Sequence, residues 1–344
     1  MNGPAFDMVI TSDRYDLAWE EEHLANLPDM EISLRVGVCG SEEALVKAIA
    51  DADAVLLTSR DEITPHVISQ LRKCKVISRY AVGIDHIDLE AASERGIVIT
   101  HAPDYCTNEV ADHALSLILG LNRRIVELHQ DLHAGSWNEH AHQTKRILRG
   151  PILPLRETTV GIVGLGRIGT AVAHRLAPFG AQIVAVDPYL APEVIRQRGA
   201  EPVDFQDLAK RADIISIHCP LTLATHGMVD AQWLAALKSG VQIVNTARGL
   251  IVNLEDLISA LQDNHVSGAA LDVVYPEPLP PESALYKLPN VILTPHSAYY
   301  SERSIAQVRR DALDGALCVL RGQFPRVVAN PSVASRVKLA PYAR

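Results

Sequence analysis

The sequence of 344 residues has no excess of positive charge, few aromatic residues (5%) and no long apolar run. Its 32 basic and 41 acidic side chains give a formal charge of −9. This balance argues against a nucleic-acid partner, because phosphate neutralisation requires clustered Lys and Arg. No apolar run approaches the ~20 residues of a membrane-spanning helix, so no membrane partner is expected. A hydrophobic fraction of 48% predicts a globular protein rather than a disordered or fibrous one.

Cysteine is also scarce and shows no pairing motif. The five cysteines are odd in number, widely spaced and without a C-x-x-C pair: Cys39, Cys74, Cys106, Cys219 and Cys318. This usage is typical of reduced thiols rather than of a disulfide scaffold or a zinc site. The N-terminus shows no basic stretch followed by an apolar one, so no signal peptide is expected. We therefore expect a cytoplasmic protein without a metal site.

Short apolar runs alternate with amphipathic stretches along most of the chain. Strands are predicted at residues 7–10, 32–38, 54–57 and 75–78, with helices at 20–27, 42–49 and 64–71 between them. After residue 158 the rhythm resumes, with strands predicted at 159–163, 182–186, 214–217, 242–245, 267–271 and 291–293. This alternation predicts βαβ units and parallel sheets. At ~150 residues per domain, the length indicates about two domains.

Two longer helices are predicted outside this rhythm. The first has Thr107 or Asn108 as its N-cap, and apolar residues recur at helical spacing from Val110 to Leu128, for about six turns. The second covers residues 302–320. Between residues 135 and 155, glycine and proline interrupt the pattern, which predicts a loop.

A glycine-rich loop follows the strand predicted at 159–163. Gly164, Gly166 and Gly169 form the pattern G-x-G-x-x-G before a helical stretch, which is typical of a dinucleotide site. The N–H groups at the start of that helix would bind a pyrophosphate. Asp187 ends the next strand. Its carboxylate would accept hydrogen bonds from the ribose hydroxyl groups and would repel a phosphate on the ribose. The sequence therefore favours NAD over NADP.

Three charged or titratable side chains each follow a predicted strand of the second series. They are Arg248, Glu277 and His296, which should meet at the carboxyl edge of the sheet. Arg binds a carboxylate bidentately, and His exchanges a proton near neutral pH. A carboxylate beside that His stabilises its protonated form. Alone, each is more often a surface charge, a turn or a satisfied polar group. Beside a dinucleotide loop, together they predict oxidation of a 2-hydroxy acid.

Several further motifs occur in a fixed order. They are RYAVGID at 79–85, HCPLT at 218–222, NTARG at 245–249, ALDV at 270–273, Glu277–Pro278 and TPH at 294–296. With the glycine-rich loop, they resemble the D-isomer-specific 2-hydroxyacid dehydrogenases, the family of phosphoglycerate, glycerate and D-lactate dehydrogenases. The resemblance runs from about residue 54 to about residue 331.

The resemblance implies two doubly wound α/β domains with parallel sheets. A flavodoxin-like substrate domain would comprise residues 1–106 and 300–344, and a Rossmann NAD-binding domain residues 107–299. It implies a homodimer that associates through the NAD-binding domain. It also implies that His296 is the catalytic acid and base with Glu277 as its partner, and that Arg248 binds the substrate carboxylate with the backbone N–H groups of Val82 and Gly83.

The same resemblance implies the cofactor contacts. Adenosine and pyrophosphate would be held by Gly164, Gly166, Arg167, Ile168, Gly169 and Asp187. The nicotinamide half would be surrounded by Cys219, Thr246, Ala247, Arg248, Asp272 and His296, with Val82 and Thr107 near the ring. Cys219 would then be a packing residue and not a nucleophile.

Departures from the family pattern leave alternatives open. The segment 105–112 is similar to the branch related to C-terminal-binding proteins, corepressors that sense NAD(H), so a nucleotide-gated binding protein is the alternative to an enzyme. His101 stands where Asn is common. Arg60 could bind a substrate phosphate, as in some phosphoglycerate dehydrogenases, but Asp61 and Glu62 would repel it. As a substrate, phosphoglycerate is therefore not favoured over glyoxylate, hydroxypyruvate or another 2-oxo acid.

Overall fold

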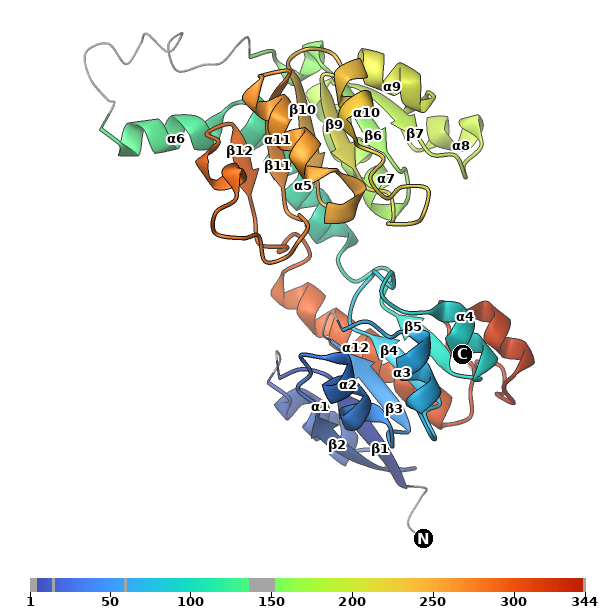
Figure 1. The fold of residues 1–344 in the computed structure, drawn as a ribbon. Helices are drawn as coiled ribbons and strands as arrows, with labels where there is room; N and C mark the ends of the chain where they lie inside the picture. The colour runs from blue at the N-terminus through green and yellow to red at the C-terminus, as the bar shows by residue number, and fades with distance from the viewer. Residues whose placement is uncertain (1–4, 14–15, 59–60, 136–151, 343–344) are drawn as a thin grey trace. The chain divides into compact units, whose positions relative to one another are not determined.

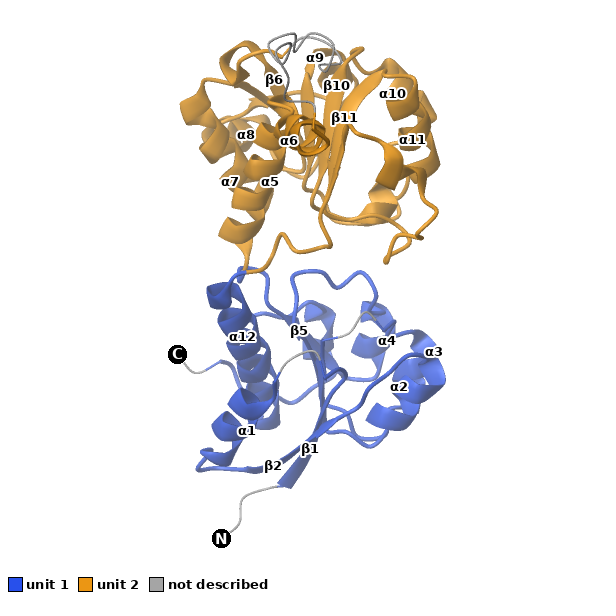
Figure 2. Ribbon diagram, turned by 90° about the vertical axis from the view of Figure 1, so that its left-hand side faces the viewer, with its two compact units in different colours: residues 1–105, 301–344 blue, residues 106–300 orange. Residues whose placement is uncertain are grey.

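The computed structural model describes residues 5–13, 16–58, 61–135 and 152–342. It divides into two compact units (Figure 2). Unit 1 comprises residues 1–105 and 301–344, and unit 2 comprises residues 106–300. Each boundary between the units differs by one residue from the bounds that we expected. Cys106 lies in unit 2 as the N-cap of the helix that begins at Thr107. Tyr300 lies in unit 2 as well, and it donates its N–H to the carbonyl of Ser297. Among the described helices, none has the length and apolarity required to cross a membrane.

Unit 1 contains a five-stranded parallel sheet with the order β2-β1-β3-β4-β5. The strands are β1 (Ala5–Ile10), β2 (Glu31–Val36), β3 (Ala54–Leu57), β4 (Val76–Arg79) and β5 (Val98–His101). This order is that of flavodoxin-like folds, so the fold predicted for this part of the chain is confirmed. β3 and β4 are fully buried, as the apolar runs that predicted them require.

Helices cover both faces of this sheet (Figure 2). One face carries α2 (Glu42–Ile49), α3 (Pro65–Gln70) and α4 (Leu89–Glu94). The other carries α1 (Ala18–Ala25) and α12 (Glu302–Leu320). α12 packs closely on the sheet, because Ser78 Oγ donates to the carbonyl of Ala312 at 2.6 Å and a Cβ on Gly315 would lie 2.8 Å from Thr100. The C-terminal segment therefore completes the core of unit 1.

Unit 2 contains a seven-stranded parallel sheet with the order β12-β11-β10-β9-β6-β7-β8. The strands are β6 (Thr159–Val163), β7 (Gln182–Val186), β8 (Glu201–Pro202), β9 (Ile214–Ile217), β10 (Val241–Asn245), β11 (Val266–Leu271) and β12 (Val291–Leu293). The order is that of a Rossmann fold with one added strand, which confirms the predicted fold class. The order reverses at β6, so the loop that follows β6 lies at the switch point where such sheets bind ligands.

Two helical layers cover the sheet of unit 2 (Figure 1). The helices of one face are α5 (Thr107–Asn122), α7 (Arg167–Leu176) and α8 (Pro192–Gln197). Those of the other are α9 (Phe205–Arg211), α10 (Ala231–Ala236) and α11 (Leu254–Gln262). Single 3₁₀ turns occupy Leu155–Glu157, Ala177–Phe179, Gly249–Ile251 (η4) and Ala284–Lys287 in unit 2, and Pro331–Ser335 in unit 1.

The single helix of about six turns predicted from Val110 to Leu128 is wrong. α5 ends at Asn122, and α6 (Ile125–His133) begins after Arg124, which has the left-handed φ of 52° and pairs with Glu127 at 3.2 Å. Neither Thr107 nor Asn108 is the N-cap, since the helix begins at Thr107 and Cys106 precedes it. Apolar spacing continues across the break, but α5 buries its apolar face whereas α6 has no buried residue.

Candidate active site

The glycine-rich loop joins β6 to α7. Gly164 has a φ of +88°, and a Cβ there would lie 2.7 Å from the Cα of Cys219. A Cβ on Gly169 would lie 2.2 Å from the carbonyl oxygen of Gly164. Both positions therefore require glycine. A Cβ on Gly166 would meet nothing within 4 Å, so the space beside its backbone is open, as the approach of a pyrophosphate requires.

The first turn of α7 provides donors at this open space. α7 begins at Arg167 and Ile168, and Gly166 is its N-cap. Since glycine has no side chain, it cannot accept a hydrogen bond from the N–H groups of this first turn. The N–H groups of a first helical turn and the positive end of the helix dipole favour an anion at this position. The loop and the helix start therefore fit the pyrophosphate of a dinucleotide.

Asp187 lies at the carboxyl end of β7, beside the loop. Its Oδ2 accepts the N–H of Leu165 at 2.9 Å, and its Oδ1 accepts the N–H of Tyr189 at 3.1 Å. These bonds fix the carboxylate next to the loop, where it suits a ribose with free hydroxyl groups. Arg198 donates to the carbonyl of Leu165, so a guanidinium that the sequence did not point to also contacts this loop.

His218 and Cys219 follow β9 beside Gly164. The ring of His218 lies 2.8 Å from Ser216 Oγ and 3.4 Å from Thr246 Oγ1, so it links β9 to the segment that carries Thr246. Burial lowers the pKa of His218 to about 4, and it raises the pKa of the Cys219 thiol to about 11. Near neutral pH the imidazole is therefore uncharged and the thiol protonated, which suits packing at Cys219 and not nucleophilic attack.

Arg248 lies in a tight turn after β10. The side chain of Asn245 holds this turn from both sides, donating to the carbonyl of Arg248 and accepting the N–H of Ala247, each at 2.9 Å. A Cβ on Gly249 would lie 2.1 Å from the carbonyl carbon of Val274, so the turn packs directly against the segment that leads to Glu277. The Arg248 turn and the Glu277 segment are therefore immediate neighbours.

Glu277 and His296 form a direct pair. Nδ1 of His296 lies 3.0 Å from Oε2 of Glu277, and Oε1 of Glu277 accepts the N–H of Val274 at 3.1 Å. Both side chains are partly exposed. β10, β11 and β12 are adjacent in the sheet, and Arg248, Glu277 and His296 all follow their carboxyl ends. The fold thus brings together three residues that lie up to 48 positions apart in the sequence.

Asp272 has a second set of contacts that the sequence did not indicate. Its carboxylate accepts Thr294 Oγ at 2.6 Å and the N–H groups of Ser297 and Ala298 at 2.9 and 3.0 Å. His113, on α5, lies 3.0 Å from Thr294 Oγ1. The carboxylate therefore anchors the segment that carries His296. No motif pointed to His113, because it lies 181 residues from Thr294.

In unit 1, Val82 and Gly83 follow β4. The carbonyl oxygen of Val82 lies 2.9 Å from Nδ1 of His101, the last residue of β5. The neighbouring Tyr80 donates its hydroxyl to the buried carboxylate of Glu20 at 3.1 Å. These bonds hold the segment whose N–H groups were predicted to bind the substrate carboxylate. Arg60, the candidate phosphate ligand, lies outside the described residues.

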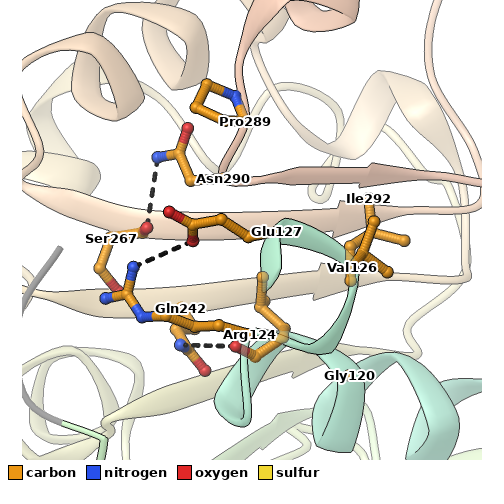
Figure 3. Close-up of a pocket in the computed structure, with 10 residues that line it drawn as sticks. Gly120, Arg124, Val126, Glu127, Gln242, Ser267, Pro289, Asn290 and Ile292 are labelled. Carbon is orange, nitrogen blue, oxygen red and sulfur yellow. Dashed lines mark hydrogen bonds and ion pairs between the residues drawn. The ribbon is translucent and has the colours of Figure 1, made fainter. Parts of the chain in front are cut away.

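A small cavity lies at the opposite edge of the unit 2 sheet (Figure 3). It is lined by Gln242, Ser267 and Asn290 at the amino ends of β10, β11 and β12, and by the Arg124–Glu127 pair at the start of α6. Parallel sheets bind ligands at their carboxyl ends, so this cavity is separate from the candidate active site. Within the described part of the chain, no cluster of His, Cys, Asp and Glu could hold a metal ion.

Comparison with known proteins identifies the family. Residues 115–298 match the model of the D-isomer specific 2-hydroxyacid dehydrogenase, NAD binding domain. The chain is 37% identical to a glyoxylate reductase of Thermofilum pendens, over 88% of this chain and 89% of the relative. It is 38% identical to a D-3-phosphoglycerate dehydrogenase of Mycobacterium leprae over 81% of this chain, but spans only 51% of that relative.

A solved structure gives the same result for the fold. D-lactate dehydrogenase from Aquifex aeolicus, complexed with NAD and lactic acid, aligns with a TM-score of 0.80 at 26% identity, covering 98% of this chain and 100% of that chain. The chain belongs to the D-isomer specific 2-hydroxyacid dehydrogenase family. It is an NAD-dependent oxidoreductase of the 2-hydroxyacid dehydrogenase type, and the open loop at Gly166 fits that cofactor.

Proposed function

We propose that this chain interconverts a small D-2-hydroxy acid and its 2-oxo acid, with His296 as acid and base, Glu277 as its partner and Arg248 as the carboxylate ligand. The observation that carries the proposal is the 3.0 Å contact between His296 Nδ1 and Glu277 Oε2, beside the Arg248 turn. When bound, NAD supplies the two-electron acceptor for the oxidation, and NADH the donor for the reduction.

His296 moves the proton in this scheme. Its Nδ1–H donates to Glu277, which sets the tautomer and leaves Nε2 as the atom that takes the proton of the substrate hydroxyl during oxidation. The imidazolium that forms is stabilised by the Glu277 carboxylate. In the reverse direction the same Nε2–H protonates the developing alkoxide of the 2-oxo acid.

Arg248 orients the substrate. A guanidinium binds a carboxylate through two parallel hydrogen bonds, which fixes the plane of the acid group and polarises the adjacent C2 carbonyl. The turn held by Asn245 limits the positions that Arg248 can adopt. In unit 1, we assign further contacts with the carboxylate to the N–H groups of Val82 and Gly83. We assign Cys219, Thr246, Ala247, Asp272 and Thr107 to the nicotinamide half of the cofactor.

We propose a short, unphosphorylated 2-oxo acid such as glyoxylate as the substrate. A glyoxylate reductase of Thermofilum pendens is 37% identical to this chain over 88% of its residues, which supports this substrate class. In addition, Asp61 and Glu62 adjoin Arg60, where they would repel a substrate phosphate. Phosphoglycerate dehydrogenase activity is the second candidate, supported by the 38% identity to the Mycobacterium leprae relative.

The test is a substrate panel with NADH and with NADPH. Glyoxylate, hydroxypyruvate, pyruvate and 3-phosphohydroxypyruvate are each supplied, and absorbance at the nicotinamide band is followed. We expect turnover of a small 2-oxo acid with NADH, and its loss in His296→Ala without loss of NADH binding. Tight NADH binding with no turnover of any acid would instead support the nucleotide-sensing alternative.

We also propose that the protein is a cytoplasmic homodimer. α6 extends away from the sheet of unit 2, has no buried residue and exposes Ile125 and Leu132 at 56% and 37% (Figure 1). Large apolar side chains on such a helix are typical of a subunit contact. Light scattering on the intact chain should give twice the mass of 37.5 kDa, and the double variant Ile125→Glu, Leu132→Glu should halve the measured mass.

The proposed cytoplasmic location is supported by the cysteines. The described cysteines are all free, which suits a reducing compartment.

A further inference from the structure

We propose that His113 is a positioning residue for the catalytic turn, acting through the hydroxyl of Thr294 and the carboxylate of Asp272. The three side chains come from α5 and from the segments that follow β12 and β11. The role proposed for His113 rests on contacts among these three side chains and with the turn that carries His296. The inference rests on the proposed role of His296, because the turn that they hold is the one that carries this residue.

The turn needs external support. His296 has a φ of 52°, in the left-handed region that residues other than glycine rarely adopt. Such a conformation persists only where surrounding contacts hold it. Asp272 supplies most of them: its carbonyl accepts the N–H of His296 at 2.8 Å, and its carboxylate accepts the N–H groups of Ser297 and Ala298.

The fourth contact sets the direction of the network. Thr294 Oγ1 lies 2.6 Å from Asp272 Oδ1, and a carboxylate can only accept, so the single hydroxyl proton of Thr294 points to Asp272. Thr294 Oγ1 is therefore an acceptor toward His113 Nε2, which lies 3.0 Å away and must carry a proton. His113 donates to Thr294, and Thr294 donates to Asp272.

The network is anchored on a rigid element. α5 has 16 residues and buries Val110, Ala111, Ala114 and Leu117 on either side of His113. Asp272 is 1% exposed and His113 25% exposed, so the bond to Thr294 is largely shielded from competing water. Removing the imidazole would leave one lone pair of Thr294 without its donor, and the hydroxyl could rotate away from Asp272. The turn would then hold His296 less firmly.

The test compares two substitutions at His113 in the full-length protein. His113→Leu removes the donor at similar volume, whereas the amide of His113→Gln can place an N–H near the position of Nε2. We expect His113→Leu to lower kcat for 2-oxo acid reduction by about tenfold or more with little change in the Kd of NADH, and His113→Gln to recover most of kcat. Ser116→Ala, on the same helix, is the matched control and should leave kcat unchanged.

A double-mutant cycle tests the route through Thr294. Thr294→Val should resemble His113→Leu, and the double variant should be no worse than the worse single variant, because both remove one network. Additive losses, equal kcat in His113→Leu and wild type, or no recovery in His113→Gln would each overturn the proposal.

A measurement without turnover separates this inference from the proposed function. Amide hydrogen exchange in a peptide covering residues 294–300 should be faster in His113→Leu than in wild type, and should return to the wild-type rate in His113→Gln. Unchanged exchange would overturn the positioning role even if the chain turned over no acid at all. If the wild type is active and the His113 variants have its kcat and its exchange rates, the positioning role of His113 is overturned while the proposed function stands.

Discussion

Oε2 of Glu277 lies 3.0 Å from Nδ1 of His296, while Oε1 of the same carboxylate is held by the N–H of Val274. The carboxylate is therefore fixed by backbone on one side and aims its second oxygen at the imidazole. A pair oriented in this way can stabilise the protonated imidazole without moving during the reaction.

The first prediction concerns the charge of Glu277. Glu277→Gln keeps the shape of the side chain but removes the charge that stabilises the imidazolium. We expect kcat for 2-oxo acid reduction to fall by about 10- to 100-fold. Steady-state rates at saturating 2-oxo acid provide the measurement, and an unchanged kcat in Glu277→Gln would exclude this role.

The second prediction concerns Arg248. Arg248→Lys keeps the positive charge but loses the planar pair of donors, so kcat/KM for the 2-oxo acid should fall by about 100-fold or more. The Kd of NADH, measured by fluorescence titration, should change little. Arg156→Lys, at an exposed ion pair, is the control and should have wild-type kcat/KM. A near-normal kcat/KM in Arg248→Lys would remove this residue from the site.

The third prediction concerns the choice of cofactor at Asp187. Its carboxylate would lie against the 2′-phosphate of NADP, and like charges in contact are strongly unfavourable. Asp187→Ser should therefore raise the ratio of kcat/KM with NADPH to that with NADH by about tenfold or more. If Arg198 contributes cationic charge near the loop, Asp187→Ser with Arg198→Leu should reverse part of the gain. An unchanged ratio in Asp187→Ser would contradict the assignment.

The fourth prediction follows from His218, whose pKa burial lowers to about 4 from an ordinary 6.5. Between these two values the unfolded chain takes up a proton that the folded chain does not. The free energy of unfolding should therefore fall as the pH drops from 6.5 toward 4, by up to about 1.4 kcal/mol per pH unit from this residue. Above pH 6.5 both states are neutral at His218 and the contribution is flat.

Urea unfolding at pH 7.5, 6 and 5 measures this effect. His218→Gln should lose less stability between pH 7.5 and pH 5 than wild type does, because Gln does not titrate. His226→Gln, at an exposed histidine, should keep the wild-type slope. Equal slopes in all three proteins would show that His218 is protonated as readily in the folded state as in the unfolded one.

The regular elements with strong apolar periodicity were accessible from sequence. The strands at Thr159–Val163, Ile214–Ile217 and Val291–Leu293 and the helix at Glu302–Leu320 have the bounds that their patterns predicted. β8 was missed because Glu201–Pro202 contains no apolar run, and its place in the sheet comes from pairing with β7. The break at Arg124 was missed because one residue in the left-handed region does not alter the apolar spacing on either side.

The candidate site was accessible only where a motif or a strand end marked it. Arg248, Glu277 and His296 each follow a strand of one sheet, so their meeting at one edge follows from topology. The bond from His113 to Thr294 does not, since it depends on the rotation of α5 about its axis and on the tight turn at residues 294–298. Sequence periodicity places a residue on a helix face but does not name the single atom that it meets.

The two-part construction of unit 1 has a consequence for synthesis on the ribosome. Unit 2 is one continuous stretch, residues 106–300, so it can close its sheet as soon as it has left the exit tunnel. Unit 1 has its five strands by residue 101 but lacks α12, which covers β3, β4 and β5 through contacts such as Ser78 with Ala312. During translation of nearly two hundred residues, the nascent N-terminal sheet keeps an apolar face open, and this face is where a chaperone would be needed.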